Sequence, residues 1–143
     1  MANFKHLPTI DFSSTNSAST VFLAMRKIMT IDKLIVHKDL VFISSTFQSL
    51  DTLKNITFEG VIGSNINLKW STLLTRPSIE SIVNHLSDTA SGKTLTLSKL
   101  AADNAFPCPM EDGNGGWINV GCGGNGEWLE LVATKSNWQI SLV

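Results

Sequence analysis

A glycine-rich segment near the C-terminus has the most chemically suggestive spacing in the chain. Residues 121–126 read Gly-Cys-Gly-Gly-Asn-Gly, which matches the G-x-G-x-x-G pattern of dinucleotide-binding loops. In such loops the glycines let a pyrophosphate approach the N-terminus of the next helix. The acidic residue that binds the ribose should follow about 20 residues later, but the given sequence ends first. No strand-helix-strand frame precedes the loop, so we expect a surface loop and no bound cofactor.

Metal-binding residue types are present, but their spacing does not indicate a metal site. The stretch from Glu111 to Gly116 offers the oxygen ligands that calcium prefers, yet an EF-hand loop starting at Asp112 would need Glu where the chain has Gly123. We therefore expect a turn there. The histidines and cysteines lack the close pairing of zinc ligands. These residues are His6, His37, His85, Cys108 and Cys122.

The residue types of a nucleophilic site also occur without the expected setting. Cys108, His85 and Asp103 offer a nucleophile, a base and an orienting acid. However, prolines flank Cys108 and no helix start beside it would lower the pKa of the thiol. The chain also lacks the G-x-S-x-G elbow of serine hydrolases. We expect no catalytic residue and a non-enzymatic protein, and the pairing of Cys108 with Cys122 stays open.

Four tryptophans and no tyrosine raise the question of a carbohydrate-stacking platform. Trp128 and Trp138 fall in a predicted helix and a predicted strand, which favours the core. Trp117 lies in the glycine-rich segment and is the best candidate for an exposed aromatic contact. It defines our alternative hypothesis, a carbohydrate-binding module that uses Trp117 and this loop.

Composition excludes several function classes. Eleven basic and twelve acidic residues give a net charge of -1, without a run of like charge. This balance argues against nucleic-acid binding, which depends on concentrated positive charge. No apolar run approaches the roughly 20 residues that cross a bilayer, so we expect no membrane insertion. The first six residues contain no apolar segment of signal-peptide length.

Internal repeats position these residues. Three segments share an apolar-x-x-apolar-x-apolar pattern and follow one another at the spacing of leucine-rich repeats. Each would form one short strand, too small to bury its own apolar side, so the strands would stack around a shared core. An open sheet with evenly spaced strands is the alternative. The three segments are Leu7 to Phe12, Ile31 to Val36 and Leu53 to Phe58.

Alternation along these strands separates a buried set from an outward set. The expected inward residues are Ile10, Phe12, Leu34, Val36, Ile56 and Phe58. The outward residues form a candidate binding face, in which Ile35 is an unusual apolar member. Together with Trp117, the predicted binding residues are Asp11, Ile35, His37, Thr57, Glu59, Asn67 and Lys69, and Ser13 lies beside them.

Downstream of the repeats, the pattern changes to that of a mixed cap. Residues 65–70 resemble a strand, Pro77 begins a helix that reaches Leu86, and residues 94–97 alternate as a strand. A short helix should end at Pro107, and a helix over 127–135 and a strand over 138–142 should close the chain. We also expect a helical turn through Phe22, Met25 and Ile28. Residues 107–126 hold seven of the ten glycines and should be the least ordered part.

Residues 47–60, and more loosely 7–11, resemble the BspA-like leucine-rich repeat proteins of bacterial surfaces and of phages of gut bacteria. The later segments 78–86, 94–97 and 135–140 look like the helix-and-strand ending that often follows such repeats. The glycine-rich insert and the small number of repeats depart from the pattern. The resemblance implies binding or display, with no shared catalytic residue and no common ligand.

These observations predict one α/β domain over residues 1–143, a short leucine-rich-repeat-like solenoid. The repeat array spans residues 5–62, and residues 63–143 form a helix-and-strand cap with the glycine-rich insert at 107–126. We expect a binding or structural module that contacts another protein, copies of itself or a surface glycan. It would act in a phage particle or on a bacterial surface as part of an assembly, although the sequence leaves the location unknown.

Overall fold

The computed structural model describes residues 5–18, 21–22 and 25–143. Its strands are β1 (His6–Asp11), β2 (Thr30–Ile35), β3 (Asn55–Glu59), β4 (Ile66–Leu68), β5 (Lys93–Leu97), β6 (Pro109–Glu111), β7 (Trp117–Asn119) and β8 (Trp138–Leu142). The helices are α1 (Arg76–Asn84), α2 (Lys99–Ala105) and α3 (Gly126–Ala133), with a 3-10 turn η1 (Cys122–Gly124).

The same hydrogen bonds recur where each coil of the chain begins, which makes the structure a stack. The backbone N–H groups of Met29 and Thr30 both donate to the carbonyl of Lys5, at 2.8 and 3.1 Å. One coil later, Lys54 and Asn55 donate in the same way to the carbonyl of Met29, at 2.9 and 3.1 Å. Each coil is therefore placed on the previous one by its backbone, independently of side-chain type.

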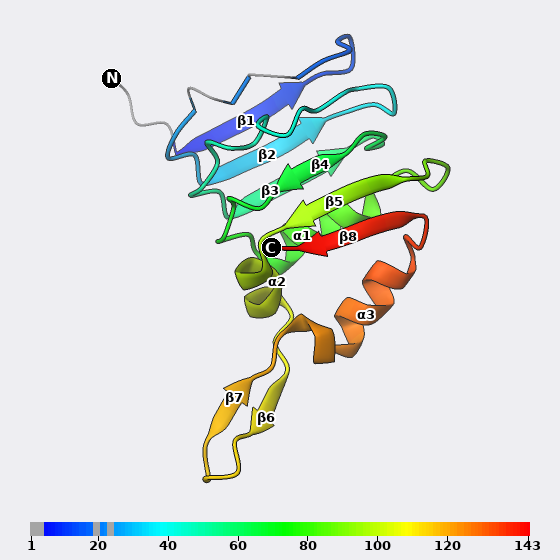
Figure 1. The fold of residues 1–143 in the computed structure, drawn as a ribbon. Coiled ribbons are helices and arrows are strands. Elements are labelled where there is room, and N and C mark those ends of the chain that lie inside the picture. The colour runs from blue at the N-terminus through cyan, green and yellow to red at the C-terminus, as the bar shows by residue number, and fades with distance from the viewer. Residues whose placement is uncertain (1–4, 19–20, 23–24) are drawn as a thin grey trace.

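Two parallel sheets form opposite sides of the stack (Figure 1). The order β1-β2-β3 makes the first sheet, and β4-β5-β8 makes the second. A bridge between Ser17 and Val41 extends the second side toward the N-terminus. The result is a solenoid-like stack of about four turns. Mixed α/β class and solenoid-like stacking, both predicted from the sequence, are confirmed at this level.

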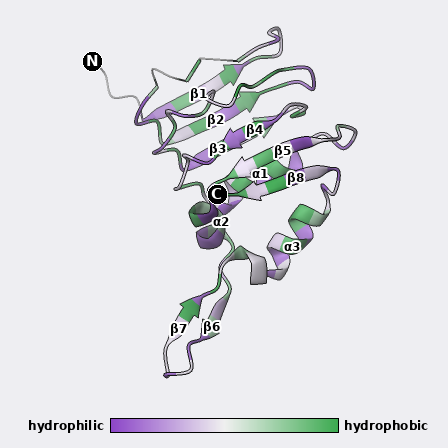
Figure 2. Cartoon of the chain, in the orientation of Figure 1, coloured by the Kyte–Doolittle hydropathy of each residue, from purple (hydrophilic) through white to green (hydrophobic). Residues whose placement is uncertain are grey.

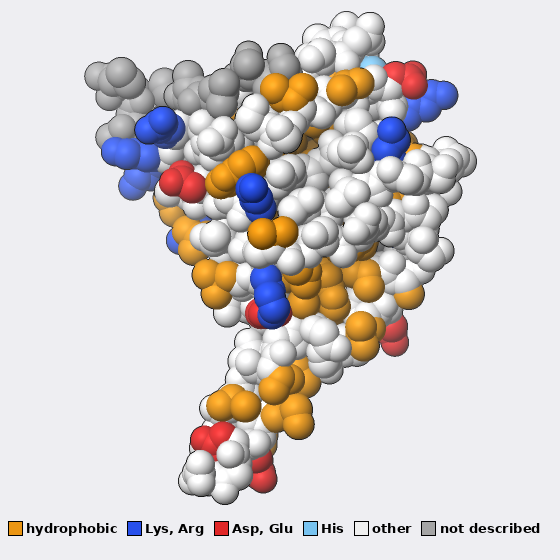
Figure 3. Space-filling view, viewed as in Figure 1, with side chains coloured by type: hydrophobic (Ala, Val, Ile, Leu, Met, Phe, Trp, Pro, Cys, Tyr) orange, Lys and Arg blue, Asp and Glu red, His pale blue; other side chains and the backbone are white. Residues whose placement is uncertain are grey.

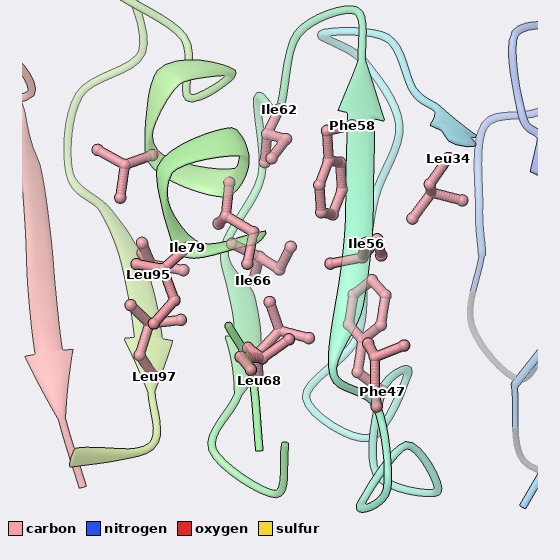
Figure 4. Packing of buried hydrophobic residues seen from close by; sticks show 14 of the residues in the cluster. Leu34, Phe47, Ile56, Phe58, Ile62, Ile66, Leu68, Ile79, Leu95 and Leu97 are labelled. Carbon is pink, nitrogen blue, oxygen red and sulfur yellow. The ribbon is translucent and has the colours of Figure 1, made fainter. Parts of the chain in front are cut away.

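The core lies between the two sheets and is filled by the inward-pointing side chains of their strands (Figure 4). Leu34, Ile56 and Phe58 enter it from the first sheet, and Leu68 and Leu95 from the second. All of these side chains are at least 98% buried. The predicted inward set is buried except for Ile10, which is half-buried on the outermost strand. The buried side of these strands was therefore predicted correctly, whereas the pairing of β2 with β3 differs from the aligned repeats, because Leu34 pairs with Phe58 and not with Ile56.

Aromatic rings pack against one another in the first two coils. The rings of Phe22 and Phe47 stack with centroids 5.3 Å apart, and Phe42 lies 5.1 Å from Phe47. The helical turn expected through Phe22, Met25 and Ile28 is not seen in its described residues, which form turns, and residues 23 and 24 lie outside the described ranges.

Helix α1 ends the first sheet by bonding to the free edge of β3. The hydroxyl of Ser78 accepts the backbone N–H of Ile56 at 3.0 Å, and the hydroxyl of Ser81 accepts that of Phe58 at 2.9 Å. Ser78 also donates to the carbonyl of Lys54 at 3.0 Å. Strand-edge groups buried without partners would each cost about 1–3 kcal/mol. The two serines thus let a helix follow where another strand would have to stack.

The loop after α1 is held by side chains from the last part of the chain. The ammonium group of Lys135 is buried, where it donates to the carbonyl of Leu86 at 2.7 Å and pairs with Asp88. The indole N–H of Trp138 donates to the carbonyl of Ser87 at 2.8 Å. A buried lysine is tolerated only when its hydrogen bonds are made, as they are here. These contacts tie the α3–β8 connection to the body.

The elements predicted after the repeats are observed with small changes of boundary. Pro77 lies in the first turn of α1, and α2 ends before Pro107. The helix predicted over 127–135 is α3, and the last predicted strand is β8. In the part of the chain that the structure describes, none of the helices has the length and apolarity to cross a membrane.

We predict that removing either serine hydroxyl of α1 destabilises the fold. Ser78→Ala should lower the free energy of unfolding by about 1–3 kcal/mol, because it leaves the Ile56 N–H buried without an acceptor. Asn84→Ala, at an exposed position of the same helix, should change it by less than about 0.5 kcal/mol. Urea unfolding followed by circular dichroism measures both. Equal values for the two variants would contradict the proposed edge cap.

Candidate interaction site

Strands β6 and β7 form a hairpin that projects from the stack (Figure 1). Its register pairs Pro109 with Asn119, Met110 with Ile118 and Glu111 with Trp117. An isolated two-stranded hairpin is marginally stable in water. Something other than its own ladder must therefore hold it.

The base of the hairpin is held by the side chain of Asn119. Its Oδ1 accepts the backbone N–H groups of Cys108 and Gly121, both at 2.9 Å, and its Nδ2 donates to the carbonyl of Asp103 in α2 at 3.1 Å. Asn125 acts beside it, because its Nδ2 donates to the carbonyl of Pro107 at 2.8 Å. Both strands are thereby fixed to the end of α2.

The tip of the hairpin is held by Asp112. Its Oδ1 accepts the N–H of Asn114 at 2.7 Å and that of Gly116 at 3.1 Å. Gly113 and Gly115 have positive φ angles of 84° and 82°, which only glycine adopts without strain. The carboxylate that suggested a calcium loop is thus an internal acceptor of the turn.

The faces of this ribbon differ in character. Alternation places Met110 and Ile118 on one face, and both are about half exposed, at 52% and 51%. Val120, 43% exposed, continues this face toward the base. The opposite face carries Trp117, which is 69% exposed and lies across from Glu111. Figures 2 and 3 show the apolar character of β7 and apolar side chains along the projecting arm.

The glycine motif at 121–126 has a packing explanation. A Cβ on Gly121 would lie 2.5 Å from Oδ1 of Asp103, and its φ of 89° also requires glycine. The same carboxylate accepts the backbone N–H of Cys122 at 2.9 Å. The Asp103 carboxylate therefore already accepts the backbone N–H that would otherwise bind a pyrophosphate. A Cβ added at Gly123 or Gly126 would have no neighbouring atom within 4 Å, so neither position needs glycine to allow a close backbone contact.

Both cysteines are free thiols in the structure. Burial, reinforced by the neighbouring Asp103 carboxylate, raises the pKa of the Cys122 thiol from its ordinary value of 9.0 to about 11. The other members of the catalytic arrangement considered above are engaged elsewhere. Nδ1 of His85 contacts the Ser81 carbonyl at 2.7 Å, and Asp103 binds the amide of Cys122 and the ammonium of Lys99.

The binding residues predicted on the open strand face are only partly brought together. Asp11, Ile35 and Glu59 are adjacent in register across β1, β2 and β3. Thr57 leaves this row because an irregularity in β2 between Ile31 and Leu34 shifts the pairing.

Asn67 and Lys69 do not belong to the row on the first sheet. Asn67 is in β4, whose partner is β5 in the second sheet, and Lys69 directly follows that strand. Their expected place beside Asp11 and Ile35 was wrong, because the chain crosses to the other side of the stack between β3 and β4. Trp117 lies apart from both groups, on the hairpin.

Most of these polar side chains also bond within their own turns. Asp11 accepts the N–H of Ser13 at 2.8 Å, and this hydrogen bonding lowers the pKa of the Asp11 carboxyl. His37 accepts the N–H of Asp39 through Nδ1 at 3.3 Å and contacts the Thr15 carbonyl through Nε2.

Asn67, Lys69 and Glu59 also have partners within the chain. Asn67 accepts the N–H of Lys69 at 3.2 Å, the ammonium of Lys69 lies 4.9 Å from the Trp70 ring centroid, and Glu59 pairs with Lys33 at 3.0 Å. Contacts within the chain account for these polar residues, whereas the large apolar residues of the hairpin have no such role.

Trp117 was predicted from the sequence as an exposed aromatic residue, whereas Met110, Ile118 and Val120 were not predicted as part of the site. A signal was present, because an Asp-Gly-Asn-Gly-Gly turn at 112–116 separates two short alternating segments, the pattern of a hairpin. The glycine content led us to expect the least ordered part of the chain instead. No family model, curated protein or solved structure shows a significant match to this chain.

We predict that the loss of stability on replacing Ile35 depends on the sign of the charge that is introduced. Ile35→Asp sets a carboxylate between Asp11 and Glu59, whereas Ile35→Lys sets an ammonium there. Like charges directly across neighbouring strands destabilise by about 0.2–1 kcal/mol, so the Asp variant should unfold at lower urea concentration. The difference should shrink in 1 M salt, where the Debye length is about 3 Å. If both variants lose the same stability, the observed register is not maintained in solution.

We predict unequal reactivity of the two thiols. Cys122 is buried and its pKa is near 11, so in the folded protein its thiolate forms only as the pH approaches that value. Cys108 is partly exposed. Iodoacetamide at pH 8 should therefore label Cys108 first and Cys122 only on unfolding or at much higher pH. Peptide mass spectrometry reads out each site, and rapid labelling of Cys122 in the native protein at pH 8 would be the contrary result.

Proposed function

We propose that this chain is a non-enzymatic protein-binding module of leucine-rich repeat type, in which the stacked coils are the scaffold and the β6–β7 hairpin is the contact element. The observation that carries the proposal is the exposure of Met110, Trp117 and Ile118 on a hairpin held at its base and tip. Large apolar groups gathered on an exposed surface mark interaction sites. Tryptophan and methionine are enriched in such interfaces.

The rigidity of the hairpin supports this proposal. Ordering a loop on binding costs about 0.5–1.5 kcal/mol for each side chain immobilised. Here Asn119 and Asp112 already order the backbone, so less of that cost falls on association. The hairpin also adds little to the core, because all six residues of β6 and β7 are exposed. We attribute its presence to a contact outside the chain.

Carbohydrate binding is the second candidate. Trp117 offers a widely exposed ring, and Glu111 lies across the ladder from it as a hydrogen-bond acceptor. This pairing suits a sugar, which stacks on an aromatic ring and donates hydroxyl hydrogens. However, it uses one face of the hairpin and leaves Met110 and Ile118 unexplained. Protein binding accounts for both faces and is our leading proposal.

Photo-cross-linking tests the two candidates. With p-benzoylphenylalanine at position 118, irradiation in an extract of cells that express the protein should give discrete protein adducts identified by mass spectrometry. The same group at Gln139, an exposed position in β8, should not give them. Asn119→Ala, which frees the base of the hairpin, should reduce the yield.

The outcomes separate the candidates. Absence of any protein adduct at position 118 would reject the protein-binding proposal. Retention of glycans on an array, lost in Trp117→Ala and kept in Ile118→Asp, would instead establish the carbohydrate alternative. An adduct that is a second copy of this chain would bear on the inference below.

A further inference from the structure

The two long edges of the hairpin are not equivalent. Within the ladder, the N–H of Val120 donates to the Cys108 carbonyl at 2.9 Å, and the N–H of Asp112 donates to the Gly116 carbonyl at 3.0 Å. Because backbone groups alternate in direction along a strand, Trp117 and Asn119 direct theirs to the outer edge of β7. Among the described strands, β6 is the sole neighbour of β7. That edge is therefore open to another strand.

The outer edge of β6 is protected. Pro109, the first residue of β6, faces this edge and has no N–H to donate, and Pro107 precedes it. Proline on an edge strand blocks pairing with a further strand. The edge of β7 holds no proline and no charged residue. One edge of the ribbon thus excludes a partner strand and the other accepts one.

We infer that two copies of this chain associate by antiparallel pairing of their β7 strands. The inference rests on the proposed function of the hairpin as a contact element. In this pairing the outward N–H and C=O groups of one β7 must face those of the other. This condition sets Trp117 opposite Asn119 of the second copy, and Ile118 opposite Ile118 of the second copy. Each Trp117–Asn119 pair then exchanges two backbone hydrogen bonds. The register is self-complementary, as a twofold interface requires.

This pairing joins the apolar faces of the two hairpins side by side. Met110 and Ile118 share a face, so two paired hairpins set four apolar side chains in one row across the joined sheet. The acidic side chains do not oppose the contact. Glu111 is on β6, so three strand spacings of about 4.8 Å separate it from its copy. That separation exceeds the Debye length of about 8 Å at physiological ionic strength.

The blocked edges limit the assembly to a dimer. Both outer strands of the joined four-stranded sheet are β6, and each carries Pro109, so no third hairpin can add. The contact is also small. It involves few residues on each side and falls below the roughly 1,200 Å² of a standard stable interface. The dimer should therefore form at concentrations of about 10 µM to 1 mM.

A charge exchange at the twofold axis tests the register. Ile118→Lys and Ile118→Asp each set two like charges face to face, and each variant should stay monomeric at concentrations where the natural chain dimerises. An equimolar mixture sets unlike charges together and should recover a dimer that contains one of each. Sedimentation equilibrium measures the mass, and circular dichroism confirms that each variant is folded.

Two proline variants test the edge. Trp117→Pro removes an outward N–H from β7 and should abolish the dimer, whereas Glu111→Pro removes one from β6 and should leave it intact. Trp117→Val keeps the N–H and separates the role of the backbone from that of the indole. The inference is overturned if the natural chain is monomeric at about 1 mM, if the two proline variants behave alike, or if the mixture does not recover association.

The cross-linking result separates this inference from the proposed function. An adduct at position 118 with a different protein, together with a monomeric chain, would retain the binding module and remove the homodimer. No adduct of any kind and no dimer would remove both.

Discussion

The structure depends on how the open edge of a parallel sheet is brought to an end. Each coil sets its backbone against the one before it, and such a stack continues until the edge groups find other partners. Here the hydroxyls of Ser78 and Ser81 supply them, since they accept the N–H groups that β3 would otherwise offer to another strand. Helix α1 can then take the position next to β3 that another strand of the stack would occupy. Helices α2 and α3 then pack against that helix.

The same helix carries the platform for the hairpin. Arg76, at the start of α1, pairs with Glu80 at 2.9 Å and also with Glu127 of α3, while its guanidinium lies 4.7 Å from the ring centroid of Phe106. The Phe106 ring in turn packs against Trp128, with centroids 5.3 Å apart. These contacts bring the end of α2 beside the start of α3. The hairpin leaves the body between these two helices, so its direction follows from how they pack.

Short polar side chains also accept backbone N–H groups at several widely separated turns. Asp11, Asn67, Asp112 and Asn119 each accept the backbone N–H of the residue two positions later. This bond stabilises a turn without help from the core. It explains why polar residues that look available for a ligand in the sequence are already committed to local structure. The large apolar residues of β6 and β7 have no comparable task within the described chain.

The sequence by itself determined the features that depend on local periodicity. The spacing of apolar residues predicted the stacked strands, the buried parity of Leu34, Val36, Ile56 and Phe58, and the start of α1 at Pro77. It also identified Trp117 as exposed and Trp128 and Trp138 as core residues. Such patterns report which side of an element is buried, because burial follows alternation or helical repeat.

Only the tertiary structure decided which elements lie side by side. The placement of Asn67 on the second sheet, the alignment of Ile35 with Glu59, and the stacking of Phe22 on Phe47 all depend on contacts between residues far apart in the sequence. The anchoring of the hairpin by Asn119 on Asp103 is of the same kind. No local pattern encodes these pairings, since they result from packing coils of unequal length around a shared core.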